Sequence, residues 1–428
     1  MNIEELHRHF ISSDSACTDT RKLSANCMFF ALRGENFNGN RYAAKAIELG
    51  AKFAVVDEQA VATDHRFILV DDVLSSLQEL SRYHRRSLSA TIIGLTGSNG
   101  KTTTKELIYA VLSTTYKTQA TKGNYNNHIG VPLTLLNLTK ETEYAVVEMG
   151  ANHQGEIAFL SGIAEPDFGY ITNFGKAHLE GFGGIEGVIK GKSELYDHLK
   201  KNEGYIFVNA QDDKQLELTN QYDKCILFNE SVVSSLNSEF ISADPYVKFK
   251  TDSELIESKL TGYYNFHNIS VAVAIGRYFG VSNENIKAAI SNYTPLNNRS
   301  EIIERNGQKI ILDAYNANPT SMKAALDNFD QIEAESKVAV LGDMFELGEY
   351  AKDEHQAITN YALETSVDQL WLVGENFFEI NTNDSRCKMF RTYEELKAYW
   401  AKHQSNYKTY LIKGSRGMAL ERVMNNLN

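Results

Sequence analysis

The sequence predicts an α/β protein of three domains: a small N-terminal α/β domain, a central P-loop domain on a parallel sheet, and a C-terminal Rossmann-like domain. Short apolar runs recur between segments of helical periodicity, which is typical of buried parallel strands joined by helices. The 428 residues are too many for one ordinary domain. A glycine-rich segment at 94–106 joins an apolar run to a helical pattern, as in sheets that bind phosphates. We expect the domains to span 1–88, 89–295 and 296–428.

The N-terminal domain is predicted from three apolar runs and two helical patterns. The runs predict strands at 28–32, 53–56 and 67–70, and the helical patterns lie at 42–49 and 73–83. A basic cluster ends the second helix and consists of Arg82, His84, Arg85 and Arg86. Such clusters are usually solvated helix ends, so we expect these side chains to be exposed and assign them no function.

The central and C-terminal domains are predicted from further apolar runs with helical segments between them. In the central domain these runs predict parallel strands at 90–93, 144–147, 170–172, 205–208 and 225–228. In the C-terminal domain they predict strands at 309–312, 338–341, 370–373 and 410–412. The alternation of strands and helices favours a doubly wound sheet in both domains.

Composition limits the partners and the compartment. A net charge of −12 leaves no basic stripe for a nucleic-acid backbone, so we expect no nucleic-acid partner. The four cysteines form no CxxC pair, which argues against a disulfide framework or a structural zinc site. No apolar run approaches the roughly 20 residues that span a bilayer, and the first residues lack the features of a signal peptide. We therefore expect a cytoplasmic protein without membrane contact.

The glycine-rich segment predicts a binding site for a nucleoside triphosphate. Glycines let the backbone approach a phosphate, the helix N-terminus presents its N–H groups, and Lys101 and Thr102 have the spacing for phosphate and magnesium contacts. Leu95 stands where the strict pattern has glycine, so the loop is a variant. The alternative is an ordinary glycine-rich turn. The residues that we expect to contact the nucleotide here are Gly97, Ser98, Asn99, Gly100, Lys101, Thr102 and Thr103.

Polar residues that follow the next central strands are candidates for metal binding. Glu148 is expected either to bind magnesium beside the triphosphate or to cap the following helix. His178 lies among glycines in a loop, where core packing is a weaker explanation than usual, although magnesium prefers oxygen ligands. Lys190 and Lys192 occupy one helical segment, and their spacing does not choose between them.

Further polar segments lie around later strands and helices. The amides of Asn265 and Asn268 introduce an apolar helix and are expected to bind an adenine edge or to cap the helix. In the C-terminal domain, the segments 313–319, 341–348 and 413–417 each place glycine or polar residues after a strand. They are either part of a nucleotide cleft or ordinary turns, because such turns use the same residues.

Taken together and in order along the whole chain, these segments resemble the Mur ligase superfamily. Within that superfamily they are most similar to the ligases that add D-alanyl-D-alanine to a UDP-N-acetylmuramoyl-tripeptide. The Asp-Asn-Pro-Arg signature of the ligases that add meso-diaminopimelate is absent. The segments that carry the resemblance are Asp19–Arg21, Phe30–Glu35, Thr96–Glu106, Gly123–Thr134, Glu148–Asn152, Tyr315–Met322, Leu341–Gly348 and Lys413–Met418.

The resemblance implies an ATP-dependent amide ligase of peptidoglycan synthesis, and so of cell-wall biogenesis, cell shape and division. ATP would phosphorylate the tripeptide carboxylate, and the dipeptide amine would displace phosphate from the acyl phosphate. We expect a monomer whose partners are these two substrates. The alternatives are another Mur-type or folylpolyglutamate-type ligase and, from a different class, a P-loop NTPase switch.

The resemblance also implies roles for the metal and phosphate residues. Lys101 would hold the β- and γ-phosphates, and Thr102 and Glu148 would bind magnesium. Two magnesium ions are expected, with His178 as a ligand of the second. Lys192 aligns with the lysine that the family carries as a carbamate, an oxygen-rich group that can hold a divalent ion. Lys101, His178 and Lys192 are thus the expected catalytic residues.

Substrate roles follow from the same resemblance. Asn265 and Asn268 match adenine-side positions, Arg299 matches an arginine near the second hinge, and Asp313 matches a nucleotide contact. The remaining expected substrate contacts are Thr20, Arg21, Asn126, Asn127, Tyr315, Asn316 and Asn318.

Overall fold

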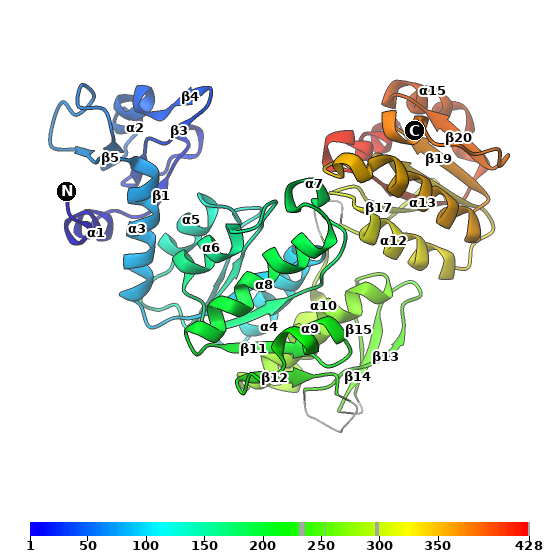
Figure 1. The fold of residues 1–428 in the computed structure, drawn as a ribbon, viewed down its shortest axis with the longest axis horizontal. Helices are drawn as coiled ribbons and strands as arrows, with labels where there is room; N and C mark the ends of the chain where they lie inside the picture. The colour runs from blue at the N-terminus through cyan, green and yellow to red at the C-terminus, as the bar shows by residue number, and fades with distance from the viewer. Residues whose placement is uncertain (231–235, 253, 296–298, 427–428) are drawn as a thin grey trace.

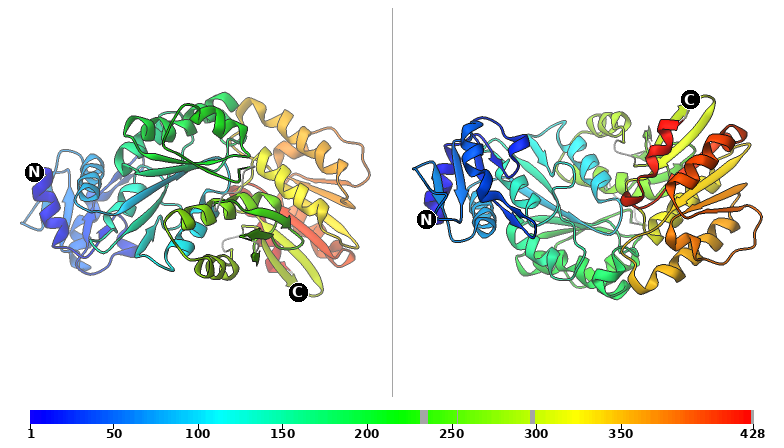
Figure 2. Two further views of the ribbon diagram at one scale, coloured as in Figure 1. Left: turned by 90° about the horizontal axis from the view of Figure 1, so that it is seen from below. Right: turned by 90° about the horizontal axis from the view of Figure 1, so that it is seen from above.

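The protein is built from three α/β units that follow one another along the chain. The computed structural model describes residues 1–230, 236–252, 254–295 and 299–426. The central unit lies in the middle, and the N- and C-terminal units lie at opposite ends (Figure 1, Figure 2). Each unit has its own sheet, so the predicted three-domain α/β fold is confirmed. The expected boundary at 295/296 adjoins residues 296–298, which lie outside the described residues.

The N-terminal unit has a parallel four-stranded sheet in the order β1-β2-β5-β6. Its middle strands are the predicted apolar runs, and β2 is buried along its whole length. The elements of this unit are α1 (Ile3–Ile11), β1 (Ala16–Cys17), η1 (Thr20–Lys22), β2 (Met28–Phe30), β3 (Arg33–Gly34), β4 (Phe37–Asn38), η2 (Gly39–Tyr42), α2 (Ala43–Glu48), β5 (Phe53–Val56), β6 (Phe67–Leu69) and α3 (Val73–Arg86).

Helix α3 joins the N-terminal unit to the central one. Its buried leucines share a core cluster with Leu133 and Leu136 of the central helix α5. The expectation that its basic end is solvated was wrong for two residues. His84 is buried and its Nε2 lies 2.9 Å from the Leu138 carbonyl oxygen, and Arg85 Nη2 lies 2.8 Å from Asp167 Oδ2. These side chains fasten the two units together.

The central unit has a six-stranded parallel sheet in the order β12-β11-β10-β7-β9-β8. Adjacent residues Ile92 and Ile93 of β7 belong to separate core clusters, which shows that both faces of the sheet are covered by apolar side chains. Its strands are β7 (Thr91–Thr96), β8 (Thr118–Ala120), β9 (Tyr144–Glu148), β10 (Phe168–Ile171), β11 (Tyr205–Asn209) and β12 (Cys225–Phe228). Its helices are α4 (Lys101–Leu112), α5 (Gly130–Leu136), α6 (Glu156–Ala164), α7 (Leu179–Phe182), α8 (Ile185–Lys201), α9 (Asp213–Thr219), α10 (Tyr263–Tyr278) and α11 (Asn283–Asn292).

A second, antiparallel sheet in the central unit was not predicted. It consists of β13 (Glu239–Ser242), β14 (Lys248–Thr251) and β15 (Glu254–Glu257). These strands alternate polar and apolar residues, as β14 shows with buried Phe249 between Lys248 and exposed Lys250. Alternation of this kind marks a sheet with one face in solvent, and a search for continuous apolar runs does not find it.

The C-terminal unit has a mixed six-stranded sheet in the order β16-β17-β21-β18-β19-β20. The strand β16 pairs antiparallel with β17, so the sheet is not purely doubly wound, while the four predicted strands are parallel. No helix in the described ranges is long and apolar enough to cross a membrane. The elements are β16 (Glu301–Arg305), β17 (Gln308–Asp313), α12 (Pro319–Gln331), β18 (Lys337–Gly342), η3 (Gly348–Tyr350), α13 (Ala351–Glu364), β19 (Gln369–Val373), α14 (Glu375–Phe378), β20 (Cys387–Phe390), α15 (Tyr393–His403), η4 (Gln404–Asn406), β21 (Thr409–Lys413), η5 (Arg416–Met418) and η6 (Leu420–Asn426).

Candidate active site

A cleft of about 670 Å³ lies between the central and C-terminal units. On the central side it is lined by the segments that follow β7, β8, β9 and β10. On the other side it is lined by the segments that follow β17, β18 and β21. These seven segments follow the carboxyl ends of strands, which is where open α/β sheets bind their ligands.

The phosphate loop between β7 and α4 depends on two glycines with positive φ. A Cβ on Gly97 (φ +142°) would lie 2.0 Å from Thr172 Oγ1. A Cβ on Gly100 (φ +78°) would lie 2.5 Å from Asn268 Oδ1. Side chains from the loop after β10 hold the turn, since Asn173 Oδ1 accepts from the Asn99 N–H at 3.0 Å. The loop is therefore fixed in shape, as a phosphate cradle needs to be.

Lys101 begins helix α4 directly after this loop. Its Nζ donates to the carbonyl oxygens of Gly97 at 2.8 Å and Ser98 at 3.2 Å. Burial lowers the pKa of the Lys101 amine, Arg299 lowers it further, and Glu148 opposes the shift. A lysine at a helix N-terminus, close to backbone N–H groups, forms a positively charged site suited to phosphate.

Glu148 ends β9 and faces the start of α4. Its Oε1 accepts from Asn126 Nδ2 at 2.8 Å and from the Thr102 hydroxyl at 3.3 Å. The alternative of a helix-capping glutamate was wrong, because Gly155 is the N-cap of the next helix. Glu148 Oε2 is buried and has no hydrogen-bond partner among the described residues. A hydroxyl and a carboxylate with an open oxygen are the donors that magnesium prefers.

Lys192 lies in the middle of α8 and is only 1% exposed. Its Nζ donates to the Ala151 carbonyl oxygen at 3.0 Å and lies 4.8 Å from the centroid of the Phe182 ring. Burial, and then the charge of Lys101, lowers the pKa of the Lys192 amine well below its usual range. Lys190 on the same helix is exposed, so the structure distinguishes the two lysines that spacing did not.

His178 occupies the N-cap position of α7 and lines the cleft. Its Nδ1 contacts Oε2 of Glu346, a residue of the C-terminal unit. The contact with His178 lowers the pKa of the Glu346 carboxyl group, although burial opposes the shift. The described residues contain no group of three or more His, Cys, Asp or Glu side chains placed to hold a metal ion. His178 and Glu148 therefore do not form such a cluster with a third side chain of these types.

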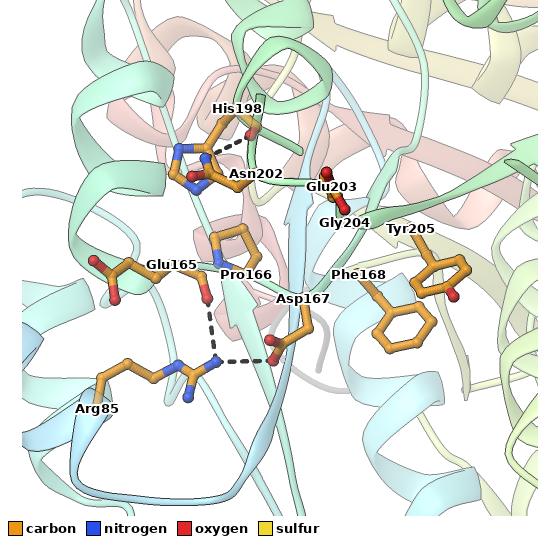
Figure 3. Close-up of a pocket in the computed structure, with 10 residues that line it drawn as sticks. All are labelled: Arg85, Glu165, Pro166, Asp167, Phe168, His198, Asn202, Glu203, Gly204 and Tyr205. Atoms are coloured by element: carbon orange, nitrogen blue, oxygen red, sulfur yellow. Dashed lines mark hydrogen bonds and ion pairs between the residues drawn. The ribbon is translucent and has the colours of Figure 1, made fainter. Parts of the chain in front are cut away.

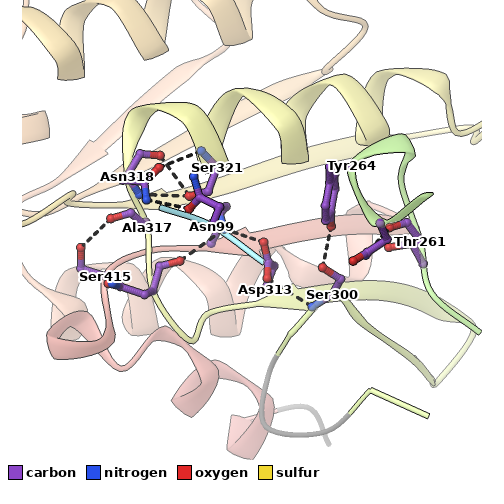
Figure 4. Close-up of polar contacts among 12 residues, drawn as sticks. Asn99, Thr261, Tyr264, Ser300, Asp313, Ala317, Asn318, Ser321 and Ser415 are labelled. Carbon is purple, nitrogen blue, oxygen red and sulfur yellow. Dashed lines mark hydrogen bonds and ion pairs between the residues drawn. The ribbon is translucent and has the colours of Figure 1, made fainter. Parts of the chain in front are cut away.

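The C-terminal side of the cleft is a network of polar contacts (Figure 4). Asp313, at the end of β17, accepts from Lys413 Nζ at 2.5 Å and from the Ser300 N–H at 3.2 Å. Asn318, the N-cap of α12, donates from Nδ2 to Asn99 Oδ1 of the phosphate loop at 2.7 Å. The two units thus touch directly at the phosphate loop.

Two arginines lie against one tyrosine in this cleft. The guanidinium carbon of Arg299 lies 3.6 Å from the centroid of the Tyr315 ring, and that of Arg416 lies 5.3 Å from it. Two guanidinium groups at one ring concentrate positive charge beside the phosphate loop. Arg416 and Glu346 lie in segments that were expected to line a nucleotide cleft, but neither residue was predicted individually.

Most of the predicted site residues line the cleft together. These are Ser98, Asn99, Gly100, Lys101, Thr102, Thr103, Asn126, Asn127, Glu148, His178, Arg299, Asp313, Tyr315, Asn316 and Asn318. Gly97 and Lys192 are not among the residues that line the cleft. Tyr264 and Asn173 also line the cleft and were not predicted.

Four predicted residues lie elsewhere. Asn265 and Asn268 are buried in α10, where Asn268 accepts from the Thr104 hydroxyl at 3.0 Å and donates to Asn265 Oδ1 at 2.8 Å. Their amide groups brace the phosphate-loop helix, and an adenine-side role stays a prediction. Thr20 and Arg21 lie in the N-terminal unit, where exposed Arg21 pairs with Asp19 at 2.8 Å.

Comparison with known proteins gives matches along nearly the whole chain. Residues 9–85 match the Mur ligase family catalytic domain, 95–276 the Mur ligase middle domain, and 298–416 the Mur ligase glutamate ligase domain. The UDP-N-acetylmuramoyl-tripeptide–D-alanyl-D-alanine ligase of Bacillus subtilis is 35% identical over 96% of this chain and 92% of its own length. The ligase of the same name from Escherichia coli is 35% identical over 98% of this chain and 95% of its own length.

Solved structures agree with these sequence matches. A crystal structure of MurF from Acinetobacter baumannii has a TM-score of 0.86 at 31% identity, and covers 100% of this chain and 98% of its own. MurF ligase from Thermotoga maritima in complex with ADP has a TM-score of 0.84 at 26% identity, and covers 98% of this chain and 97% of its own. The family matches, the near full-length relatives and the shared fold agree: the chain belongs to the Mur ligase family.

Proposed function

We propose that the protein is the ATP-dependent ligase that joins D-alanyl-D-alanine to UDP-N-acetylmuramoyl-tripeptide for peptidoglycan synthesis. The observation that carries this proposal is the 35% identity, over 96% or more of the chain, to two ligases of that name. The geometry supports it, because one cleft combines a phosphate loop with a polar surface from the C-terminal unit. Two substrates can therefore meet at the γ-phosphate of one ATP molecule.

The reaction needs two steps and no protein nucleophile. In the first, an oxygen of the tripeptide carboxylate attacks the γ-phosphorus of ATP. ADP leaves, and an acyl phosphate of the tripeptide is formed. In the second, the dipeptide amine attacks the acyl carbon, phosphate leaves, and the amine loses its proton. The main obstacle is the approach of two anions. Lys101 and the N–H groups at the start of α4 would reduce it by neutralising charge and fixing the phosphate in place.

Magnesium fits the donors on the central side of the cleft. Thr102 and Glu148 would hold one ion, since the buried Oε2 atom of Glu148 has no partner among the described residues. His178 and a modified Lys192 would serve a second ion. When bound, the metal ions would neutralise the phosphates during transfer. Glu148 is kept in place for this role by the amide group of Asn126.

A carbamate on Lys192 is supported by the state of its amine. The lowered pKa favours the neutral amine, which is the form that attacks carbon dioxide. The nitrogen would form a bond to the carbon of CO2 and release a proton to solvent, which turns a buried neutral amine into an anion with two oxygen donors. The side chain would then suit a divalent cation.

We propose the remaining roles from the resemblance to the family. Tyr315, Asn316 and Asn318, with Asn126 and Asn127, would contact the reacting groups or the dipeptide. Arg299 and Asp313 would contact the nucleotide, while Thr20 and Arg21 would contact the UDP-sugar. We propose that domains 1–88, 89–295 and 296–428 bind the UDP-sugar, ATP and the dipeptide in a monomeric enzyme.

A mass-spectrometric assay with UDP-muramoyl-tripeptide, ATP, Mg²⁺ and D-alanyl-D-alanine tests the proposed function. The expected product is the UDP-muramoyl-pentapeptide, with one phosphate released for each amide formed. Parallel reactions replace the dipeptide with single amino acids or omit it. Ligation of a single amino acid in preference to the dipeptide would assign the protein to another ligase of the superfamily. Phosphate release without any acceptor would instead indicate a P-loop NTPase switch.

A further inference from the structure

The cleft contains a guanidinium group, that of Arg416, whose charge is not balanced by a described acidic side chain. Arg416 begins η5, shortly after β21, and lines the cleft. Within the part of the chain that the structure describes, its side chain makes no hydrogen bond or ion pair, and its guanidinium carbon lies 5.3 Å from the centroid of the Tyr315 ring. Lys413, three residues earlier, is instead paired with Asp313. Arg416 is therefore suited to bind an anion that enters the cleft.

The backbone that carries Arg416 is held in place from two sides. Ser415, the preceding residue, donates its N–H to the Asp343 carbonyl oxygen at 3.0 Å, and its Oγ accepts from the Phe345 N–H at 2.9 Å. Gly417, the following residue, lies against the Phe345 ring, because a Cβ there would lie 2.7 Å from Phe345 Cε2. Phe345 itself is 42% exposed and lines the cleft. A guanidinium group and an aromatic ring thus face the cleft together.

This segment is connected to the phosphate loop by hydrogen bonds. Ser415 Oγ donates to the Ala317 carbonyl oxygen at 3.5 Å, and the next residue, Asn318, donates to Asn99 Oδ1 of the loop at 2.7 Å. Arg416 therefore follows a residue that is two contacts away from the phosphate loop, on the C-terminal side of the cleft.

The other arginine at the Tyr315 ring is accounted for by the phosphates. The charge of Arg299 lowers the pKa of the Lys101 amine, so these two cations act together at the phosphate loop. In the proposed reaction, this side of the cleft would meet the phosphates and the tripeptide carboxylate that is phosphorylated. The terminal carboxylate of the dipeptide does not react, and it needs a separate cation.

The size and chemistry of the dipeptide match the surroundings of Arg416. Two residues span at most about 7 Å, so the terminal carboxylate must be bound in the same cleft as the reacting amine. An arginine can hold a carboxylate by two parallel hydrogen bonds. The Tyr315 ring would keep the planar guanidinium group in place. The two methyl groups of the dipeptide are apolar, as is the exposed ring of Phe345.

We propose that Arg416 binds the terminal carboxylate of D-alanyl-D-alanine and that Phe345 packs against its methyl groups. This inference rests on the proposed function, in which the dipeptide is the second substrate. It assigns the selection of a dipeptide with a free carboxyl group to the segments that follow β18 and β21. Arg416 acts on binding of the dipeptide and leaves the transfer of phosphate from ATP to other residues.

Steady-state ligation by the full-length protein tests the proposal with two acceptors, D-alanyl-D-alanine and its C-terminal amide, which lacks the negative charge. We expect the wild type to prefer the free carboxylate by about 10- to 100-fold in kcat/KM, as for a charge-assisted hydrogen bond. In Arg416→Met this preference should fall below about threefold, because only the uncharged contacts remain. The KM for the dipeptide should rise and the KM for ATP should not. Arg416→Lys keeps the charge but loses the planar fork, so its preference should be intermediate.

Phe345→Ala tests the apolar contact with a third acceptor, glycylglycine, which lacks both methyl groups. The preference for D-alanyl-D-alanine over glycylglycine should fall by about fourfold for each methyl group that the ring covers. The matched control is Arg391→Met. The guanidinium carbon of Arg391 also lies near an aromatic ring of the same unit, 4.4 Å from the Phe378 centroid, but Arg391 does not line the cleft. It should keep both preferences, and an unchanged preference in Phe345→Ala would refute the apolar contact.

The outcomes separate this inference from the proposed function. If the wild type forms no product with D-alanyl-D-alanine, the proposed function fails and this inference fails with it. If the wild type forms the product and Arg416→Met still prefers the free carboxylate as strongly, only the role of Arg416 fails. A rise in the KM for ATP or for the tripeptide substrate, with that for the dipeptide unchanged, would assign the guanidinium group to another anion and also overturn the proposal.

Discussion

The central sheet uses polar side chains in opposite ways at the two ends of its strands. The amino ends of the strands form one side, the amino edge, and the carboxyl ends form the other, the carboxyl edge. At the amino edge, a crevice of about 510 Å³ contains Arg85, whose Nη2 donates to Asp167 at 2.8 Å and to the Glu165 carbonyl oxygen at 3.2 Å (Figure 3). At the carboxyl edge, Glu148 Oε2 and Asn99 Nδ2 are buried without a hydrogen-bond partner in the described chain.

The amino edge therefore forms a contact between two units, and the carboxyl edge of the same sheet forms a binding site. Arg85 contacts the segment before β10 and so fastens the N-terminal unit to the central one; only its Nε is buried without a partner among the described residues. At the other edge, the open oxygen of Glu148 and the lowered pKa of two buried lysines mark groups that a ligand would complete. Substitutions at the carboxyl edge should therefore reduce catalysis, while those at the amino edge should reduce stability.

The largest effect is expected for Lys101→Ala at the carboxyl edge. Loss of the phosphate-binding cation should lower product formation by about 10³-fold, as expected when a charge that stabilises the transition state is removed. Thermal unfolding should change little, because within the described residues the lysine side chain hydrogen-bonds to the carbonyl oxygens of Gly97 and Ser98 alone. Phosphate release with both substrates and a melting curve measure the two quantities. Near-normal turnover would contradict the assignment of this edge as the binding site.

Lys192→Met should separate catalysis from stability at the same edge. Ligation should fall roughly 100-fold because the proposed carbamate is lost, and added bicarbonate should not restore it. Lys190→Met is the matched control, since Lys190 is exposed on the same helix and should be silent. Full activity in Lys192→Met would refute the carbamate.

The stability of Lys192→Met should depend on pH in CO2-free buffer. The pKa of Lys192 is lowered in the folded protein, so unfolding takes up a proton between that pKa and about 10.4, the value of an unfolded lysine. The wild type therefore loses stability as the pH falls through this window, and the variant does not. The stabilisation by methionine should grow as the pH falls below about 10, by at most about 1.4 kcal/mol per pH unit. Urea unfolding of both proteins measures this difference in the free energy of unfolding. A difference that does not change with pH would show that the amine is not buried as a neutral group.

Arg85→Ala tests the amino edge. It removes a half-buried ion pair and a hydrogen bond to the Glu165 carbonyl oxygen. Asp167 keeps a partner, because Oδ2 also accepts from the Ile92 N–H at 2.7 Å. We expect a loss of about 1–2 kcal/mol in the free energy of unfolding. The kcat should stay within about threefold, and a much larger loss of turnover would break the distinction between the edges.

The smallest effect is expected for Arg86→Ala at the same joint. The Arg86 side chain is 61% exposed and pairs with Glu165. Exposed pairs contribute about 0–1 kcal/mol, so the stability change should stay below about 1 kcal/mol. It should also shrink in 0.5 M salt, which screens exposed charges. A loss of stability as large as that of Arg85→Ala would mean that the exposed fraction of a side chain does not predict how much its ion pair contributes to stability.

Much of the fold followed from continuous apolar runs. Residues Val338 to Leu341 lie in a strand that is buried on both faces. Such a strand contains a continuous run of apolar residues, which is the pattern used to predict it. The strands β14 and β16 have polar residues on one face or at their ends and were missed. The order of strands in each sheet was not predicted either, because it depends on contacts between distant segments.

The site was predictable where chemistry follows a strand end. Thr102 and Glu148 were expected to meet because neighbouring parallel strands end at one edge, and their oxygens lie 3.3 Å apart. Lys192 was chosen only by resemblance, although Val188, Lys192 and Leu195 share the buried face of α8. Glu346 was beyond prediction, since its contact with His178 depends on how two units dock.

The bond between Asn99 and Asn318 also identifies a point for inhibition. It joins the phosphate loop to the N-cap residue of a helix in another unit, at 2.7 Å. A small molecule that hydrogen-bonded to both amide groups would separate the two units without carrying a phosphate. Such an inhibitor would distinguish this enzyme from proteins that share its phosphate loop, because the second amide is supplied by a different unit.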